Sequence, residues 1–279
     1  PFPALMDAYR ALLGDNKIDL ALKAQILKFP TENYLLEAIP QADIEAMHHA
    51  SEFVKLEIAK TLKTELLECY KNNCENKPYT LDAISVGKRD LKNLCLYYLM
   101  HLNSQEIFDI CLQQLEHANN MTDTLACLTA ISNSHYPKRE QILEDYYQKW
   151  EDHPNLVNKW LTINATIKLF GTLEHVQKLT QHQAFNITNP NKVYALIRTF
   201  CEQNHINFHE AKGAGYKFLA DQVLAIDKFN PHLAAIIVVP LTRGHKHNKV
   251  RQQLLKQELL RISQDPDLSK NVYELVAKS

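Results

Sequence analysis

Histidine spacing is the first feature to inspect for chemistry, because imidazole is the commonest side-chain ligand of metal ions. A zinc peptidase helix carries His-Glu-x-x-His, in which two histidines one turn apart face one ion. No such pentapeptide occurs, since His209-Glu210 is followed by Ala-Lys-Gly and the second ligand is missing. His48 and His49 are adjacent and would point about 100° apart on a helix, which is poor geometry for one ion.

The remaining close histidine pair lies in a basic stretch. His245 and His247 could chelate an ion weakly in an extended chain. The surrounding segment, Arg243–Lys249, is better interpreted as a solvated basic turn.

No other short motif carries recognisable chemistry. A Gly-x-Ser-x-Gly elbow and a Walker loop are both missing from the sequence. Gly213-Ala-Gly215-Tyr216 has part of a dinucleotide-binding pattern, but the third glycine is missing, so we interpret it as a helix entrance where two backbones approach closely. Carboxylates such as Glu65 and Glu68 have helical spacing, as most surface acids do. We therefore predict no catalytic residue, no metal ligand and no cofactor in this chain.

The composition narrows the class of protein. Hydrophobic residues make up 46% of the 279 residues, enough for a substantial core, and 31 basic residues nearly balance 32 acidic ones. This balance argues against nucleic acid and anionic membranes as partners. The six cysteines form no Cys-x-x-Cys pair, so we expect buried free thiols in a reducing cytoplasm. We find no signal peptide and no run that would span a bilayer, and Pro1 in place of methionine is compatible with a chain cut from a longer one.

Helical periodicity extends over most of the chain. Only 6 glycines occur and alternating strand patterns are almost absent. We interpret the one β-like run, Ala234–Val239, as a buried helix, because Asn230-Pro231 is a good helix start. Helices are predicted over residues 3–13, 17–29, 43–73, 86–100, 104–117, 120–132, 137–150, 154–170, 172–180, 190–202, 214–229, 231–241, 245–264 and 268–278. Short polar turns between them predict an all-α solenoid of antiparallel helix pairs, similar to HEAT or armadillo arrays but with an irregular repeat. No linker divides the chain, so we expect one domain over residues 1–279.

Five strings occur in an order that resembles a known family. They are ANNMTDTLACLTAI (Ala118–Ile131), KWEDHPNLVNKWLTINA (Lys149–Ala165), NPNKVYALIRTF (Asn189–Phe200), GAGYKFLADQVLAIDKFNP (Gly213–Pro231) and LSKNVYELVAKS (Leu268–Ser279). Together they resemble the C-terminal helical domain of bacterial aminopeptidase N, the alanyl aminopeptidases among the gluzincin zinc metallopeptidases. The resemblance runs from about Leu62 to the end and is strongest in the second half.

The resemblance implies a role in a larger enzyme. In that family a helical superhelix closes over an active site whose zinc ligands lie in an upstream domain. This chain would be the lid and channel domain, inactive alone. Its partners would be the catalytic and N-terminal domains of the same polypeptide and the peptide substrate of the zinc enzyme.

The resemblance also implies a set of residues that line the substrate cavity. These are the polar entrances equivalent to Asn189, Asn191, Lys192 and Tyr194, and to His232. Relatives have arginines near these entrances, where this chain has Lys192, Tyr194 and Ile236. A helix start with Lys192 could hold a carboxylate or carbonyl of the peptide, while the simpler reading is that the asparagines only cap helices.

Two alternatives remain open. Composition and helix pattern fit equally well a free-standing helical-repeat scaffold that binds a protein or peptide in its concave surface. The second alternative is an independent enzyme that uses His245 and His247, or the cysteines. Turnover of a substrate by the purified chain would support it.

Overall fold

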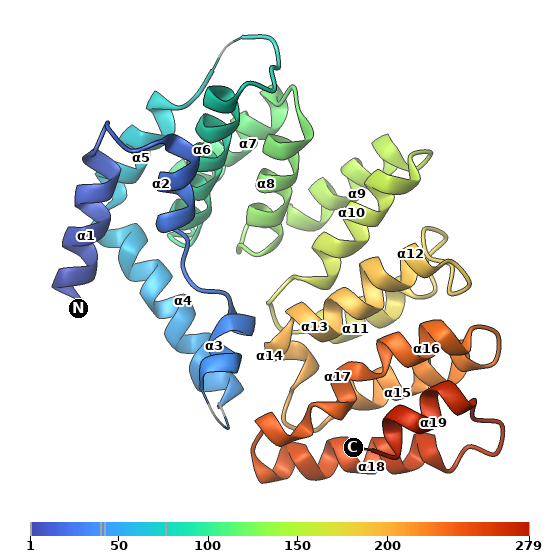
Figure 1. The fold of residues 1–279 in the computed structure, drawn as a ribbon. Coiled ribbons are helices and arrows are strands. Elements are labelled where there is room, and N and C mark those ends of the chain that lie inside the picture. The colour runs from blue at the N-terminus through green and yellow to red at the C-terminus, as the bar shows by residue number, and fades with distance from the viewer. Residues whose placement is uncertain (1, 40, 42, 76, 279) are drawn as a thin grey trace. The chain divides into compact units, whose positions relative to one another are not determined.

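The computed structural model describes residues 2–39, 41, 43–75 and 77–278, and its ordered elements over these ranges are all helical (Figure 1). The all-α prediction is therefore confirmed, while the predicted domain ends Pro1 and Ser279 lie outside the described residues. None of the helices in the described ranges combines the length and the apolar character needed to cross a membrane.

The chain forms two compact units that interleave along the sequence. Unit 1 comprises Pro1–Pro30 and His49–Asp145, and unit 2 comprises Thr31–His48 and Tyr146–Ser279. The α4 helix thus contributes its first residues to unit 2 and the rest to unit 1. One domain over residues 1–279 stays a prediction.

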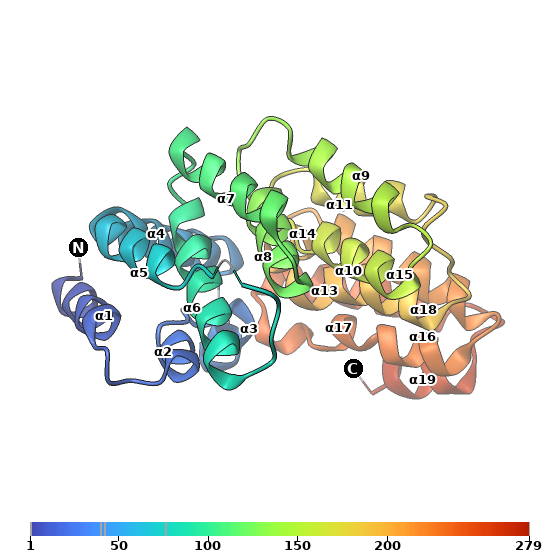
Figure 2. The same ribbon diagram turned by 90° about the horizontal axis from the view of Figure 1, so that it is seen from above.

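Unit 1 is built from helices that pack in neighbouring pairs (Figures 1 and 2). Its elements are α1 (Pro3–Gly14), α2 (Leu20–Ile26), most of α4 (Ile44–Thr61), α5 (Lys63–Asn72), α6 (Ala83–Met100), α7 (Gln105–His117), α8 (Met121–Ser132) and the first half of α9 (Arg139–Trp150). The α6 helix is central, because it contacts α2, α5 and α8, and α7 packs on α8. Its apolar face supplies Leu91, Cys95 and Leu99 to a core that α1 joins through Met6. Burial of these side chains provides most of the unit's stability.

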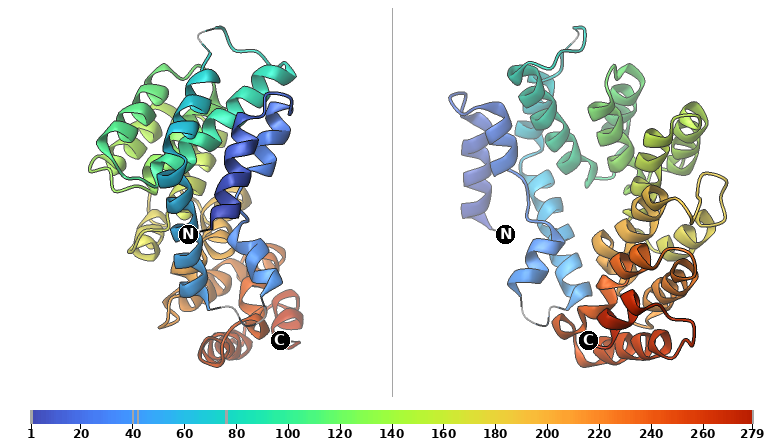
Figure 3. Two further views of the ribbon diagram at one scale, coloured as in Figure 1. Left: turned by 90° about the vertical axis from the view of Figure 1, so that its left-hand side faces the viewer. Right: turned by 45° about the vertical axis from the view of Figure 1, so that its right-hand side comes forward.

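Unit 2 continues the same construction (Figures 1 and 3). Its elements are α3 (Glu32–Ala38), α10 (Pro154–Ala165), α11 (Thr172–Leu179), α12 (Pro190–Val193), the π-helix η1 (Tyr194–Arg198), α13 (Thr199–Gln203), α14 (His205–Phe208), α15 (Ala214–Asp227), α16 (Pro231–Ile237), α17 (Val239–Thr242), the 3-10 turn η2 (Gly244–Lys246), α18 (Lys249–Ser263) and α19 (Lys270–Val276). The η1 segment packs on α10, α15 packs on α16 and α18, and α16 packs on α19.

Several predicted helices are interrupted. The helix predicted over residues 43–73 breaks at Leu62, and the one over residues 190–202 contains η1. The helix predicted over residues 231–241 is interrupted at Val238. Pro240, two residues later, has no N–H to donate to a helical hydrogen bond. The short helices α3 and α14 were not predicted. Residues 234–237 lie in α16, so the interpretation of the β-like run as a buried helix is confirmed.

The glycine-rich entrance to α15 is a site of close backbone approach, as predicted. A Cβ atom placed on Gly215 would lie 2.2 Å from the carbonyl oxygen of Phe208, and Gly213 has φ of +76°. Both positions require glycine, because a side chain would clash at the first and strain the backbone at the second. The cysteines are all free thiols, and five are buried, but Cys74 is exposed and departs from the prediction.

Candidate functional site

The predicted entrance at Asn189 is a capped helix start. The Asn189 Oδ1 atom accepts the backbone N–H of Asn191 at 3.0 Å, and Pro190 occupies the first helical position. Both asparagines are exposed. The capping role of Asn189 is therefore confirmed, and the Asn191 side chain is directed to solvent rather than to the core.

The entrance continues into the π-helix η1. Lys192 is partly buried, and this burial lowers its pKa. The guanidinium of Arg198 lies 5.6 Å from the centre of the Tyr194 ring. The Thr199 hydroxyl donates to the Tyr194 carbonyl at 2.9 Å, a bond across five residues that fits the wider helical turn. Short π segments of this kind are often found at functional sites.

His232 lies on a second entrance of unit 2. The Asn230 Oδ1 atom accepts the Leu233 N–H at 3.0 Å and caps α16, and His232 is exposed on its first turn. Figure 1 shows α12 and α16 entering from the same side of unit 2 and running in the same direction. The structure thus places the predicted residues at helix starts, and within the described ranges it records no hydrogen bond from His232 to Asn189, Asn191, Lys192 or Tyr194.

The remaining sequence candidates have structural partners. His209 Nδ1 lies 2.9 Å from the Tyr216 hydroxyl, and the two Glu210 oxygens accept the backbone N–H groups of Lys212 and Ala214. The His-Glu pair therefore organises the start of α15 and does not have the arrangement of zinc ligands. His245 is exposed but His247 is buried, so the interpretation of the whole segment as a solvated turn is wrong for His247.

Sequence reasoning missed a buried group of three histidines in unit 2. The ring centres of His209 and His247 lie 4.2 Å apart, and His205 stacks on His209 with centres 5.6 Å apart. Burial lowers the pKa of His205 and of His247 to about 4 and that of His209 well below its ordinary value. The Nδ1 atoms of His205 and His247 have no hydrogen-bond partner in the described part of the chain. Uncharged imidazoles therefore pack here as aromatic core.

Polar contacts tie the early segment Thr31–His48 to the rest of unit 2. The Glu32 Oε1 atom lies 2.7 Å from Lys168 Nζ and 2.9 Å from His48 Nδ1. Burial alone would raise the pKa of Glu32, but these two partners outweigh it and lower the pKa to about 2. Asn33 bonds His205, and Glu45 pairs with Arg251, whose Nε donates to the His209 carbonyl.

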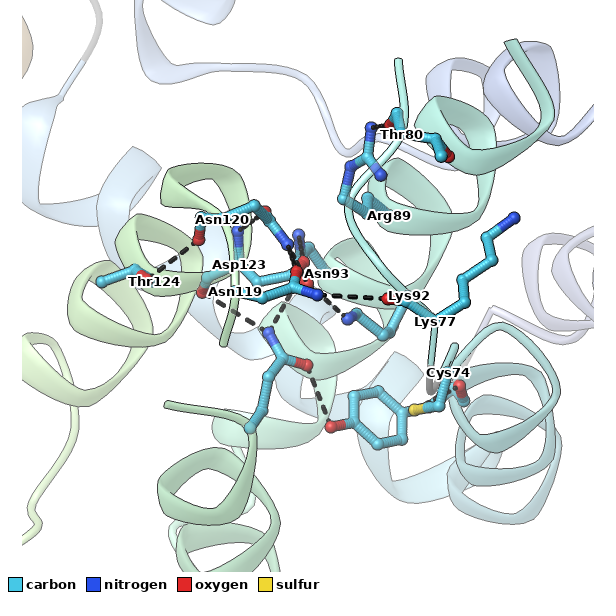
Figure 4. A network of polar contacts seen from close by, with 12 residues as sticks. Cys74, Lys77, Thr80, Arg89, Lys92, Asn93, Asn119, Asn120, Asp123 and Thr124 are labelled. Atoms are coloured by element: carbon cyan, nitrogen blue, oxygen red, sulfur yellow. Dashed lines mark hydrogen bonds and ion pairs between the residues drawn. The ribbon is translucent and has the colours of Figure 1, made fainter. Parts of the chain in front are cut away.

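A polar network in unit 1 surrounds a buried ion pair (Figure 4). Lys92 Nζ of α6 lies 2.8 Å from Asp123 Oδ2 of α8. The other carboxylate oxygen accepts from Asn93 at 2.9 Å, and Asn120 caps α8 and donates to Oδ2 at 3.0 Å. Gln114 extends the network by donating to Asn93 at 2.8 Å. The Asp123 charge is thus compensated by one cation and two amides.

A recess opens beside this network, bounded by the segment between α5 and α6, by α6 and by the start of α8. We call it the α6–α8 recess. Its cavity volume is about 30 Å³, and its lining includes Glu75, Lys77, Arg89, Lys92, Asn120 and Asp123. Arg89 is largely buried and lies over the Tyr79 ring with its central carbon 4.8 Å from the ring centre. Figure 4 draws Arg89, Lys77 and Lys92 in the same close-up as Asn120 and Asp123.

The sequence alone offered little indication of the α6–α8 recess. Asn119 and Asn120 were recognisable as an N-cap, because they precede an apolar helical pattern. Lys92 and Arg89 look like ordinary surface residues of a helix, and only the packing of α8 on α6 reveals their burial.

Comparison with known proteins gives a consistent set of matches. Residues 2–279 match the family model described as "Domain of unknown function (DUF3458_C) ARM repeats". The chain is 33% identical over 273 residues to aminopeptidase N of Escherichia coli (strain K12), covering 98% of this chain and 31% of that protein. It is 35% identical over 273 residues to aminopeptidase N of Caulobacter vibrioides, covering 98% and 32%.

A solved structure agrees with these matches. The crystal structure of Legionella pneumophila aminopeptidase A in complex with aspartic acid superposes with a TM-score of 0.90 and 30% identity, over 99% of this chain and 33% of that one. The chain spans about a third of the length of the relatives it matches.

Proposed function

Since this chain belongs to the DUF3458_C family of ARM-repeat domains, we propose that it is the C-terminal lid and channel domain of a zinc-dependent aminopeptidase. The observation that carries the proposal is the match to aminopeptidase N along nearly the whole chain but only 31% of that protein. A segment of that size, whose ordered elements over the described residues are all helices, would serve as a wall around a reaction centre. A covered site strengthens electrostatic interactions and admits only peptides that can thread in.

The zinc and its ligands would belong to the remainder of the polypeptide. In this chain the His209-Glu210 pair is engaged in the hydrogen bonds that begin α15 and does not fit a zinc site. The catalytic and N-terminal domains would be the partners of the lid, and peptides released by cytoplasmic protein turnover would be the substrates. Nucleic acid and membranes have no place in this proposal.

Comparative assays test the proposal. We expect the protein encoded by the complete gene to hydrolyse alanyl anilides, and the 279-residue chain to have no such activity and to bind no stoichiometric zinc. The upstream coding sequence should contain His-Glu-x-x-His. Turnover by the purified 279-residue chain would contradict the proposal, and lack of the motif upstream would favour a helical-repeat scaffold.

The polar entrances would contact the peptide beyond the bond that is cleaved. Asn191 is exposed and Lys192 partly buried, so both side chains have polar atoms available. The lowered pKa of Lys192 reflects an environment in which an ion pair with a peptide carboxylate would be stronger than in water. Tyr194 and His232 present flat rings at the same pair of helix starts.

Substitutions in the complete enzyme separate cavity lining from capping. We expect Lys192→Met to raise the KM for tripeptides by about tenfold, the effect of losing one charge-assisted hydrogen bond, with a smaller effect for Asn191→Ala. Lys178→Met, at an exposed position on α11, is the matched control. Asn189→Ser keeps the cap, so a change in KM without a change in stability would identify a substrate contact. Unchanged KM values in all these variants would remove these residues from the cavity.

A further inference from the structure

We propose that the α6–α8 recess of unit 1 binds a single carboxylate group through the guanidinium of Arg89. This inference is independent of the peptidase function, because it concerns a different unit from the polar entrances and requires no catalysis. It follows from the hydrogen-bond donors left in the recess, from its charge and from its size.

The groups that remain available in the recess are cationic donors. The Asn120 amide donates to Asn119 and Asp123, and the Asn119 amide donates to the Lys77 carbonyl at 3.2 Å. Arg89 donates from one terminal nitrogen to the Thr80 carbonyl at 2.9 Å. The described residues contain no carboxylate paired with Arg89, although a guanidinium has five N–H groups. An acceptor from outside the chain would complete these bonds.

The charges that line the recess also favour an anion. Its described lining includes the cations Lys77, Arg89 and Lys92 and the carboxylates Glu75 and Asp123. Asp123 is matched by Lys92, and Glu75 is shared by Lys77 at 3.1 Å and Lys88 at 2.9 Å. The three cations and two carboxylates of the lining leave one excess positive charge, which suits a monoanion.

Size and shape select a carboxylate among monoanions. The cavity volume of about 30 Å³ is roughly two water-sized positions, which is the requirement of two carboxylate oxygens. A planar guanidinium can bind a carboxylate with two parallel hydrogen bonds. It can bind a phosphate in the same way, so the small volume of the recess, rather than the fork, disfavours a tetrahedral anion. The Tyr79 ring, 47% exposed at the rim, offers an apolar surface for whatever carries the carboxylate.

Nuclear magnetic resonance of the ¹⁵N-labelled 279-residue chain tests the proposal. Acetate, a dipeptide with a free C-terminus and the same dipeptide with a C-terminal amide are titrated at constant ionic strength, with chloride and sulfate as reference anions. We expect saturable shifts of the Arg89 Nε–H and of backbone signals from residues 77–80, with a Kd on the order of millimolar. A dipeptide that binds more tightly than acetate would identify a peptide C-terminus as the source, and equal affinity would identify the carboxylate alone.

Variants link the shifts to the recess. Arg89→Met should weaken carboxylate binding by about tenfold or more, and Arg89→Lys less, because the charge stays while the planar fork is lost. Arg10→Met, at an exposed arginine of α1 in the same unit, should bind as the wild type does. Lys77→Met provides a test without risk to folding, since its side chain is 46% exposed, and should weaken binding about twofold to threefold.

The proposal is overturned if the amide-capped dipeptide binds as well as the free one, if sulfate binds more tightly than acetate, or if folded Arg89→Met binds unchanged. If acetate causes no saturable shift in the spectrum of the wild-type chain, the proposal is overturned without any variant. None of these outcomes depends on whether the complete protein has peptidase activity. The two proposals can therefore fail independently of each other.

Discussion

Lys92 Nζ lies 2.8 Å from Asp123 Oδ2, and the two side chains are only 9% and 8% exposed. The pair joins α6 to α8 across 31 residues of sequence. Two charges removed from water are stable only together, because the desolvation of each is offset by the other and by the surrounding amides.

Removal of one member of this pair should therefore be costly. We expect Asp123→Ala to lower the free energy of unfolding by about 3–5 kcal/mol, since it leaves the Lys92 ammonium buried without a counter-charge. Urea unfolding followed by circular dichroism measures the change. The double variant Lys92→Met, Asp123→Leu should recover much of the loss. A single variant that costs less than about 1 kcal/mol would show that water replaces the carboxylate.

The buried histidines should make the chain unstable in mild acid. Because burial lowers the pKa of His205 and His247 from 6.5 to about 4, the unfolded state binds more protons between these values. Their effect on stability is fully favourable above pH 6.5 and is lost as the pH falls toward 4. At pH 5 each group should cost about 2 kcal/mol relative to pH 7. Urea unfolding at pH 7 and pH 5 measures the difference.

Neighbouring cations add to the effect of burial and further lower the pKa of His205 and His247. His205 faces Lys168 and Arg243 as well as Glu32, and His247 faces Arg251 and Lys246. We expect His247→Gln to reduce the pH dependence, and His135→Gln, at an exposed position, to leave it unchanged. Glu32 acts in a separate window, because its pKa of about 2 makes its contribution disappear only between pH 4.5 and pH 2. Equal pH dependence in the His247 and His135 variants would contradict this interpretation.

The entrance to α15 should tolerate no side chain at Gly215. The added Cβ of Gly215→Ala would meet backbone atoms of Phe208, which cannot move without displacing α14. We expect a loss of about 3 kcal/mol or more. Gly14→Ala is the matched control, since its Cβ would have no neighbour within 4 Å, and it should be neutral or slightly stabilising. Thermal melts of both variants measure the contrast, and equal melting temperatures would refute it.

The Asn230 cap should be worth about 1 kcal/mol to unit 2. Asn230→Ala removes the acceptor for the Leu233 N–H, whereas Asn230→Ser keeps an oxygen in reach of it. Urea unfolding should rank the wild type and the serine variant together, above the alanine variant. If all three unfold alike, water satisfies the helix start as well as the side chain does.

Local signals predicted much of the helical order. The caps of α8, α12 and α16 were readable, because an asparagine before an apolar or proline-led pattern has few other uses. The breaks were not readable. Leu62 is a good helix former and fully buried, so the interruption between α4 and α5 reflects packing rather than any glycine or proline.

The candidate site was predictable only in part. Asn189, Asn191, Lys192, Tyr194 and His232 came from a resemblance, and the structure adds that they lie at helix starts. The histidine group could not be predicted, because His205 and His247 are 42 residues apart and meet only after α15 and α18 have packed. The environment of Arg89 could not be predicted either. Its burial follows from helix packing, and only the structure shows that the described residues contain no carboxylate paired with it.

The assignment of Thr31–His48 to unit 2 has a consequence for synthesis on the ribosome. This segment emerges long before Lys168, His205 and Arg251, its partners, the last of which lies 206 residues beyond Glu45. Until then the nascent chain carries an unpaired amphipathic stretch within an otherwise foldable first half. Unit 1 can begin to fold during translation, whereas unit 2 closes only when its last long helix has been made.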